Sequence, residues 1–229
     1  ESVDGMIVTD WPLFFSSKET LEKIDVPCVI VSDPEKNIRA HFVCGDNVRG
    51  GELAAQLLYE KGHEKIAILS GHDWSSDNYL RIQGFRQFFR RVGTAIPQEM
   101  IFKANYEEDD ASKIVEQIIM EKIKFTAIFC CNDNMAIGAI RKLKQLGIRC
   151  PEDVSVIGYD DEGRSQHLMP PLTTVRVPVS DFGRVAVEKM SAFLKGAEKD
   201  KFYYEQTILP VSLIERGSVG PVPRRLKKA

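Results

Sequence analysis

The sequence lacks the features that define several large classes of proteins. No apolar run approaches the roughly 18–20 residues of a membrane-spanning helix, and no signal-peptide pattern opens the chain. The five cysteines are odd in number and show neither a CxxC motif nor His/Cys ligand spacing, which argues against disulfides and zinc. A net charge of −2 gives no basic field for nucleic acid. We therefore expect reduced thiols, a cytoplasmic location, no membrane contact and no cofactor.

Catalytic motifs are also missing. There is no Walker loop, no GxGxxG and no nucleophile elbow, and the four histidines do not cluster in the sequence. His63, in a turn between a helix and a strand, is expected to be structural. Asp46, Asp160 and Asp161 could form an acidic cluster of the phospho-acceptor type, but no matching lysine follows a later strand. An enzyme would lack a nucleophile, base or metal, so we expect a binding protein.

The segment from Thr126 to Asp161 contains the clearest structural pattern. An apolar run at 127–131 breaks into Asn132-Asp133, and a helical pattern over 134–146 follows directly and stops at Gly147. A second apolar run at 154–158 ends in Tyr159-Asp160-Asp161. Strand, helix and strand in this order form the repeating unit of a parallel sheet. Both strands carry polar groups just past their carboxyl ends, where ligands bind in open α/β sheets.

The same alternation runs through the whole chain and predicts an α/β fold with parallel sheets flanked by helices. Further strands are expected at 3–9, 27–31, 42–44, 65–69, 100–103 and 206–214. Further helices are expected at 16–24, 48–61, 77–92, 109–122 and 179–194. Ser16 and Glu19 have the spacing of a capping box. The pattern is compatible with two lobes joined by several crossings.

Seven segments, in order along the chain, resemble the effector domain of the lactose-repressor/galactose-repressor (LacI/GalR) transcription regulators. They are VDGMIVTD at 3–10, VPCVIVSD at 26–33, GDNVRGGELAAQLLYEKGHEKIAILSG at 45–71, YLRIQGFRQFF at 79–89, TAIFCCNDNMAIGAIRKLKQLGIRCPEDVSVIGYDD at 126–161, PPLTTVRVP at 170–178 and ILPVSLIERG at 208–217. The resemblance spans essentially the whole chain.

This resemblance implies a two-lobed, periplasmic-binding-protein-like fold that holds a small molecule, with a sugar as the expected effector, and a homodimer. The N-terminal lobe would contain 1–44 and 178–200, the C-terminal lobe would contain 45–177 and 201–217, and 218–229 would be a flexible tail. Because the chain starts directly in a strand pattern, we expect sequence before it. The resemblance implies that the missing part completes the N-terminal lobe and carries the helix-turn-helix domain that binds DNA.

Three residues correspond to effector contacts of the family. Arg81 matches its arginine, whose guanidinium can donate a forked pair of hydrogen bonds; the alternative is a surface arginine on a helix. Asn132 could pair with a diol, or cap the helix that follows it. Asp160 could accept hydroxyl hydrogen bonds, or shape a turn. For Asp133 beside Asn132 we expect a capping or structural role.

Three further residues complete the predicted ligand site. Tyr106 falls where the family has an aromatic residue that stacks on the effector, although it could instead cover a helix start. Asp77, one turn before Arg81, could add a polar contact or cap its helix. Ser32 stands where many relatives have an aspartate, and here Asp33 is the next residue. The effector of a well-studied relative should therefore not be transferred to this chain.

A second hypothesis is an extracytoplasmic sugar-binding protein that feeds a transporter, because such proteins share the fold. The unpaired cysteines and the segments at 170–178 and 208–217 favour the regulator. The residues that precede Glu1 would distinguish the two, since a helix-turn-helix supports the regulator and a signal peptide supports the transporter component.

Overall fold

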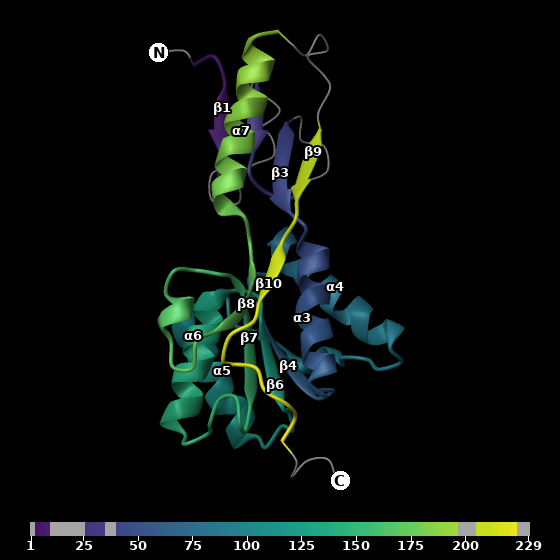
Figure 1. The fold of residues 1–229 in the computed structure, drawn as a ribbon, viewed down its shortest axis with the longest axis vertical. Helices are drawn as coiled ribbons and strands as arrows, with labels where there is room; N and C mark the ends of the chain where they lie inside the picture. The colour runs from purple at the N-terminus through teal and green to yellow at the C-terminus, as the bar shows by residue number, and fades with distance from the viewer. Residues whose placement is uncertain (1–2, 10–25, 35–39, 197–204, 224–229) are drawn as a thin grey trace. The chain divides into compact units, whose positions relative to one another are not determined.

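The computed structural model describes residues 3–9, 26–34, 40–196 and 205–223. The predicted helix at 16–24, with its capping pair, lies outside the described residues. The chain divides into two compact units, which we describe separately (Figure 1). Unit 1 comprises Glu1–Asp46 and Pro178–Pro210, and unit 2 comprises Asn47–Val177 and Val211–Ala229. The chain therefore passes between the units three times.

Unit 1 is built on a four-stranded parallel sheet. Its strands, in spatial order, are β1 (Met6–Val8), β2 (Cys28–Ile30), β3 (His41–Gly45) and β9 (Gln206–Leu209). Helix α7 (Val179–Leu194) packs Ala186 and Met190 against Val29 and Val43 on one face of this sheet. Strands buried on both faces are typical of parallel sheets, and this explains why β2 is apolar throughout.

Unit 2 contains a six-stranded sheet with the order β10-β8-β7-β6-β4-β5. The strands are β4 (Ile66–Ser70), β5 (Ile101–Lys103), β6 (Ala127–Cys130), β7 (Ser155–Asp160), β8 (Thr173–Arg176) and β10 (Ser212–Ile214). All neighbours pair in parallel except β10, which runs antiparallel to β8. The predicted α/β class with parallel sheets is confirmed.

Four helices cover the two faces of the unit 2 sheet. They are α3 (Asn47–Glu60), α4 (Ser76–Arg91), α5 (Glu108–Met120) and α6 (Asp133–Gln145). Figure 1 shows α3 and α4 on one side of the sheet and α5 and α6 on the other. Short 3₁₀ turns, η1 (Gln98–Met100) and η2 (Ser165–His167), lie in the connections. Gly147, where the sequence predicts the end of a helix, has a positive φ, and so do Gly62 and Gly93 after their helices.

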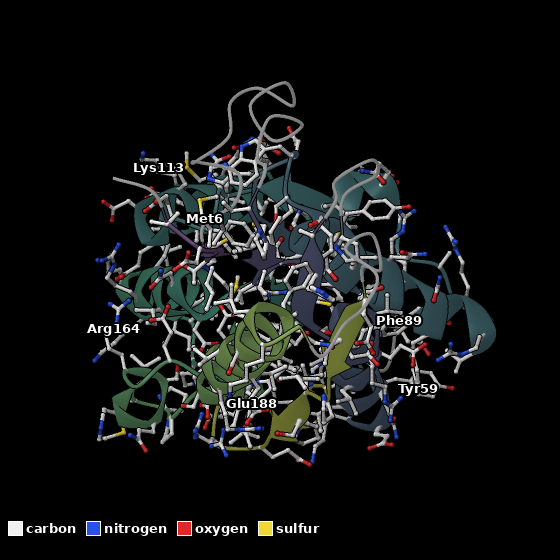
Figure 2. All side chains as sticks on the ribbon, turned by 90° about the horizontal axis from the view of Figure 1, so that it is seen from above. Met6, Tyr59, Phe89, Lys113, Arg164 and Glu188 are labelled. Carbon is white, nitrogen blue, oxygen red and sulfur yellow. The ribbon has the colours of Figure 1, made fainter. Side chains whose placement is uncertain are left out.

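Glycines bring α3 and α4 into backbone contact. A Cβ atom at Gly84 would lie 1.9 Å from the carbonyl oxygen of Val48, and one at Gly51 would lie 2.0 Å from an α4 carbonyl. Farther along, Tyr59 of α3 meets Phe89 of α4 edge-on, with ring centroids 6.2 Å apart (Figure 2). The close approach fixes where α4 presents its first turn at the edge of the sheet.

The predicted single strand at 206–214 is wrong. Residues 206–209 form β9, which pairs with β3 in unit 1, whereas residues 212–214 form β10, which pairs with β8 in unit 2. Pro210 lies between them and has no N–H to donate to a ladder. Residues 205–210 therefore belong to unit 1, and not to the C-terminal lobe to which 201–217 were assigned.

The predicted flexible tail is also partly wrong. Ser218 is fully buried: its hydroxyl accepts from the backbone N–H of Thr173 at 2.8 Å and donates to the Val156 carbonyl at 2.6 Å. His63 contacts the Gly220 carbonyl at 2.9 Å, and burial lowers the pKa of this histidine. Residues 218–223 are thus part of unit 2, and the structural role predicted for His63 is confirmed. Residues 224–229 lie outside the described residues.

Among the described residues, no helix is long and apolar enough to cross a lipid bilayer. The five cysteines are free thiols, four of them buried and Cys150 half-buried. Burial raises the pKa of Cys131 to about 12, so this thiol is protonated at neutral pH.

Candidate functional site

The carboxyl ends of the parallel strands in unit 2 gather polar side chains at one edge of the sheet. Chain order reverses between β4 and β6, since β5 lies outside β4 while β6, β7 and β8 follow on the other side. Such a switch point is where open α/β sheets bind ligands. Arg81 lies on the helix that follows β4, and its side chain spans the switch point between β4 and β6. Its Nη1 donates to the carbonyl of Cys131, just past β6, at 2.6 Å.

Arg81 is the centre of this edge and is almost completely buried. Its Nη1 lies 3.1 Å from Oδ1 of Asp160, and its Nη2 lies 3.8 Å from Oδ2 of Asp77. The guanidinium also covers the ring of Tyr159 at 3.9 Å from the centroid, a cation–π arrangement. The two carboxylates are more open, with 40% of the Asp77 side chain and 31% of the Asp160 side chain exposed. The edge thus presents one buried cation between two partly exposed anions.

The pKa values of Arg81 and Asp160 are set by burial and by the charges beside them. Burial by itself lowers the pKa of Arg81, but the negative charges around it, Asp160 first, outweigh burial and hold the pKa above its ordinary value. For Asp160 burial dominates and raises the pKa to about 7, against the opposing effect of Arg81. Arg81 is therefore always charged, while Asp160 titrates near neutral pH.

Backbone strain concentrates at the same edge. Asp160 has φ 106° and Asp161 has φ 59°, at the end of β7, while Asn105 and Tyr106 have φ 53° and 65°, after β5. These are four of the five non-glycine residues with positive φ in the described part of the chain. Such conformations cost free energy and cluster at binding sites, so the geometry here is held by the surrounding structure.

Asn132 takes the capping role that was the alternative to a ligand contact, and the structural role expected for Asp133 is confirmed. Asn132, not Asp133, is the N-cap of α6, because its Oδ1 accepts from the N–H of Met135 at 2.9 Å. Its Nδ2 donates to the carbonyl of Tyr106 at 3.1 Å. Both ends of the amide are thus engaged, and only its second donor hydrogen and acceptor lone pair remain for a ligand.

Asp133 is a buried structural residue. Its carboxylate accepts from the hydroxyls of Ser165 at 2.5 Å and Thr174 at 2.6 Å, and from the N–H of Glu162 at 2.9 Å. Burial raises its pKa to about 6 despite these three hydrogen bonds. Asp133 therefore ties the start of α6 to β8 and to the loop that follows β7.

Tyr106 is held in place by the loop after β4. A Cβ atom at Gly71 would lie 2.1 Å from the ring of Tyr106, so the glycine is what allows this packing. The hydroxyl of Tyr106 lies 2.9 Å from that of Ser75, and His72 meets the ring edge-on at 5.7 Å. His72 in turn stacks on Trp74, which is 57% exposed. Trp74 was not among the predicted site residues.

The remaining predicted residues divide between the units. Asp77 is not the cap of α4, since Ser75 accepts from the N–H of Asn78 at 3.2 Å. Asp77 stands instead in the first turn of α4, beside Arg81. Ser32 is in unit 1, after β2, and is half-buried. Its ligand role stays a prediction.

Asp161 forms ion pairs with two arginines. Oδ2 accepts from Nε of Arg176 and Oδ1 pairs with Nη2 of Arg216, both at 2.7 Å. Burial raises the pKa of Asp161, but its two arginine partners outweigh burial and lower it. Asp161 therefore joins the ends of β7 and β8 to the segment that follows β10.

Two residues that hold Arg81 were not predicted. Asn47, the first residue of α3, accepts from Nε of Arg81 at 2.9 Å, and Tyr159 lies beneath the guanidinium plane. In the sequence Asn47 follows a strand pattern as Asn132 does, and this is the signal that could have identified it. Within the described residues, no group of three or more His, Cys, Asp or Glu side chains could hold a metal ion.

Comparison with known proteins assigns the family. The periplasmic binding protein-like domain family matches residues 55–219. A LacI family transcriptional regulator from Enterococcus faecium, with bound ribose, is 27% identical and superposes with a TM-score of 0.82 over 96% of this chain and 81% of its own. The transcriptional regulator CelR, in complex with cellobiose, is 28% identical with a TM-score of 0.84, over 94% of this chain and 66% of its own. The chain belongs to the LacI family.

Several relatives of the chain are transcriptional repressors. The HTH-type transcriptional repressor PurR of Vibrio vulnificus is 37% identical over 204 residues, which are 89% of this chain and 61% of the relative. The chain thus spans about three fifths of the length of the curated relatives it matches. It is the effector-binding domain of a LacI-family regulator with a periplasmic-binding-protein-like fold, as predicted from the sequence.

Proposed function

We propose that this LacI-family domain senses a neutral, hydroxyl-rich small molecule, a sugar or a compound that contains one. The observation that carries the proposal is the position of Arg81 between two partly exposed carboxylates. Its Nη2 makes no hydrogen bond to any described residue and faces Asp77 at 3.8 Å. A sugar hydroxyl can accept from this nitrogen while it donates to a neighbouring carboxylate.

The charges at this edge argue against an anionic effector. Arg81 contributes one positive charge, whereas Asp77 and Asp160 contribute two negative charges when both are ionised. A carboxylate or phosphate ligand would gain one attraction and meet two repulsions at short range. Ribose and cellobiose, which occur in the related structures, are neutral polyols, so they agree with this preference.

The other predicted site residues receive specific roles in this proposal. Tyr106 offers an aromatic ring beside the sugar, and Asn132 offers its remaining amide donor. The relatives are regulators, so we propose that the chain is not an enzyme.

The whole protein would act as a cytoplasmic homodimer that binds DNA through a helix-turn-helix domain outside this chain. Effector binding would favour one arrangement of the two units, and the dimer would pass that change to the DNA-binding domains. The effector can shift this equilibrium only by its difference in affinity for the two states.

A thermal-shift screen of the chain against sugars and nucleosides, D-ribose and cellobiose included, tests the proposal. A ligand that binds only the folded state at 100 times its Kd stabilises it by about 2.7 kcal/mol. We expect neutral polyols to raise the melting temperature, and sugar phosphates and sugar acids to do so less. A screen in which only anions stabilise the chain would contradict the proposal.

The raised pKa of Asp160 makes sugar affinity depend on pH. If the sugar hydroxyl donates to the ionised carboxylate, a pKa of about 7 predicts a Kd about tenfold higher at pH 6 than at pH 8. The Asp160→Asn variant should bind weakly with a flat profile between these values, measured by calorimetry.

The contribution of Asp160 to folding stability has the opposite pH dependence. A pKa raised from 3.8 stabilises the folded chain below about pH 4, and this contribution disappears as the pH rises through 7.

A further inference from the structure

We infer that Asn47 is the positioning residue that sets the direction of the Arg81 guanidinium, and thereby the sugar affinity of the site. Its side-chain Oδ1 accepts from Nε of Arg81 at 2.9 Å, and its Nδ2 donates to Oδ1 of Asp77 at 3.2 Å. Asn47 is only 5% exposed. This one amide therefore joins the buried cation to one of the two carboxylates that flank it.

The geometry of a guanidinium explains why this contact matters. The group is planar, so two contacts on different nitrogens fix both its position and its rotation about the side-chain axis. At Arg81 these contacts are Nη1 with the Cys131 carbonyl and Asp160, and Nε with Asn47. Together they leave Nη2 pointing along one direction, beside Asp77. Without Asn47, Nη1 keeps its contacts and the Tyr159 ring still lies beneath the plane, but Nε loses its partner and the guanidinium can rotate within that plane about Nη1.

An amide is also the side chain best suited to this position. Oδ1 satisfies an N–H that would otherwise be buried without a partner, and Nδ2 meets the Asp77 carboxylate with a donor. An aspartate at this position could accept from Arg81 but would repel Asp77. An alanine could do neither. Asn47 thus holds Arg81 and Asp77 side by side, where one hydroxyl of a ligand can contact both.

The effect on affinity rests on the proposed sugar-binding function, but the effect on Arg81 does not. A misdirected Nη2 loses one charge-assisted hydrogen bond to the ligand, which corresponds to about 10–100-fold in Kd. The buried contacts of Nη1 are unchanged by the substitution, so the chain should fold. Asn47→Ala should therefore weaken binding of D-ribose and cellobiose by this factor.

The experiment uses the whole chain and two measurements. The first is the Nε–Hε signal of Arg81 in ¹H–¹⁵N NMR spectra, assigned by its absence in Arg81→Lys. In the wild-type chain the Hε hydrogen should exchange slowly with water. In Asn47→Ala it should exchange fast, and in Asn47→Asp it should stay protected. The second is the Kd for D-ribose and cellobiose by calorimetry.

Asn134→Ala is the matched control, because Asn134 accepts a hydrogen bond from another arginine, Arg164, on the outside of unit 2. It should leave both the Arg81 signal and the two Kd values unchanged. A protected Arg81 signal in Asn47→Ala would overturn the inference whatever the ligand is. An exposed signal with unchanged sugar affinity would overturn the link to binding. Loss of protection in a chain that binds no sugar would support the positioning of Arg81 and refute the proposed function instead.

Discussion

Replacing Arg81 with lysine is expected to abolish the thermal shift that sugars give the wild-type chain, while the fold is kept. Lysine retains the positive charge beside Asp160, so this carboxylate is not left without a cation. It cannot supply the forked donors, and it loses the contact with Asn47 and the planar stack on Tyr159. The loss should be at least about 10–100-fold in Kd, because the charge-assisted hydrogen bond from Nη2 to the sugar disappears together with the contacts that hold the guanidinium.

Arg86→Lys provides the matched control for this experiment. Arg86 lies on the same helix, and its hydrogen bond goes to the exposed side chain of Gln98. It should keep the wild-type response to sugars. Arg81→Ala should lose the response as well, with a lower melting temperature because Asp160 then lacks its partner. A full sugar shift in either Arg81 variant would mean that the ligand binds elsewhere.

Gly84→Ala is expected to destabilise unit 2 by about 3 kcal/mol. The added Cβ atom would lie 1.9 Å from the Val48 carbonyl oxygen, and backbone atoms cannot move aside as a flexible side chain can. Helices α3 and α4 must then separate along their contact. Native-state hydrogen exchange should report faster opening of both helices, and thermal unfolding should give a lower midpoint.

Gly183→Ala is the control for the change of glycine to alanine in a helix. Nothing lies within 4 Å of a Cβ atom at this position of α7, so only the backbone effect remains. Alanine should stabilise the helix by about 0.5–1 kcal/mol, because glycine loses more conformational freedom on folding. If Gly84→Ala proved as harmless as Gly183→Ala, the tight contact between α3 and α4 would be wrong.

The sequence was sufficient to predict which strands end in polar groups. Asn132 and Asp160 each follow an apolar run, and parallel strands bring their carboxyl ends to one edge. Arg81 was identified through its resemblance to the family, because a lone arginine in an amphipathic helix has no local signature. The structure adds its burial and its contact with Asp160, which no sequence period could indicate.

Local patterns could not decide between neighbouring polar residues. Asn132 and Asp133 are both suitable N-caps for α6, and Ser75 and Asp77, two positions apart, are both suitable N-caps for α4. Tertiary contacts decide each case. Ser165 and Thr174, far along the chain, bind the carboxylate of Asp133 and leave Asn132 to cap the helix. The role of Asn47 could not be predicted for the same reason, because its partners Arg81 and Asp77 lie on another helix.

The break at Pro210 has a consequence for how the protein is made. The parallel edge strand of one sheet, β9, and the antiparallel edge strand of the other, β10, come from a single stretch of nine residues, 206–214. During synthesis on the ribosome, therefore, neither sheet has its last strand until this stretch has emerged. The two units then finish together, although domains commonly complete their folding in order from the N-terminus. A ribosome that stops before Gln206 would release a chain in which both sheets have an open edge.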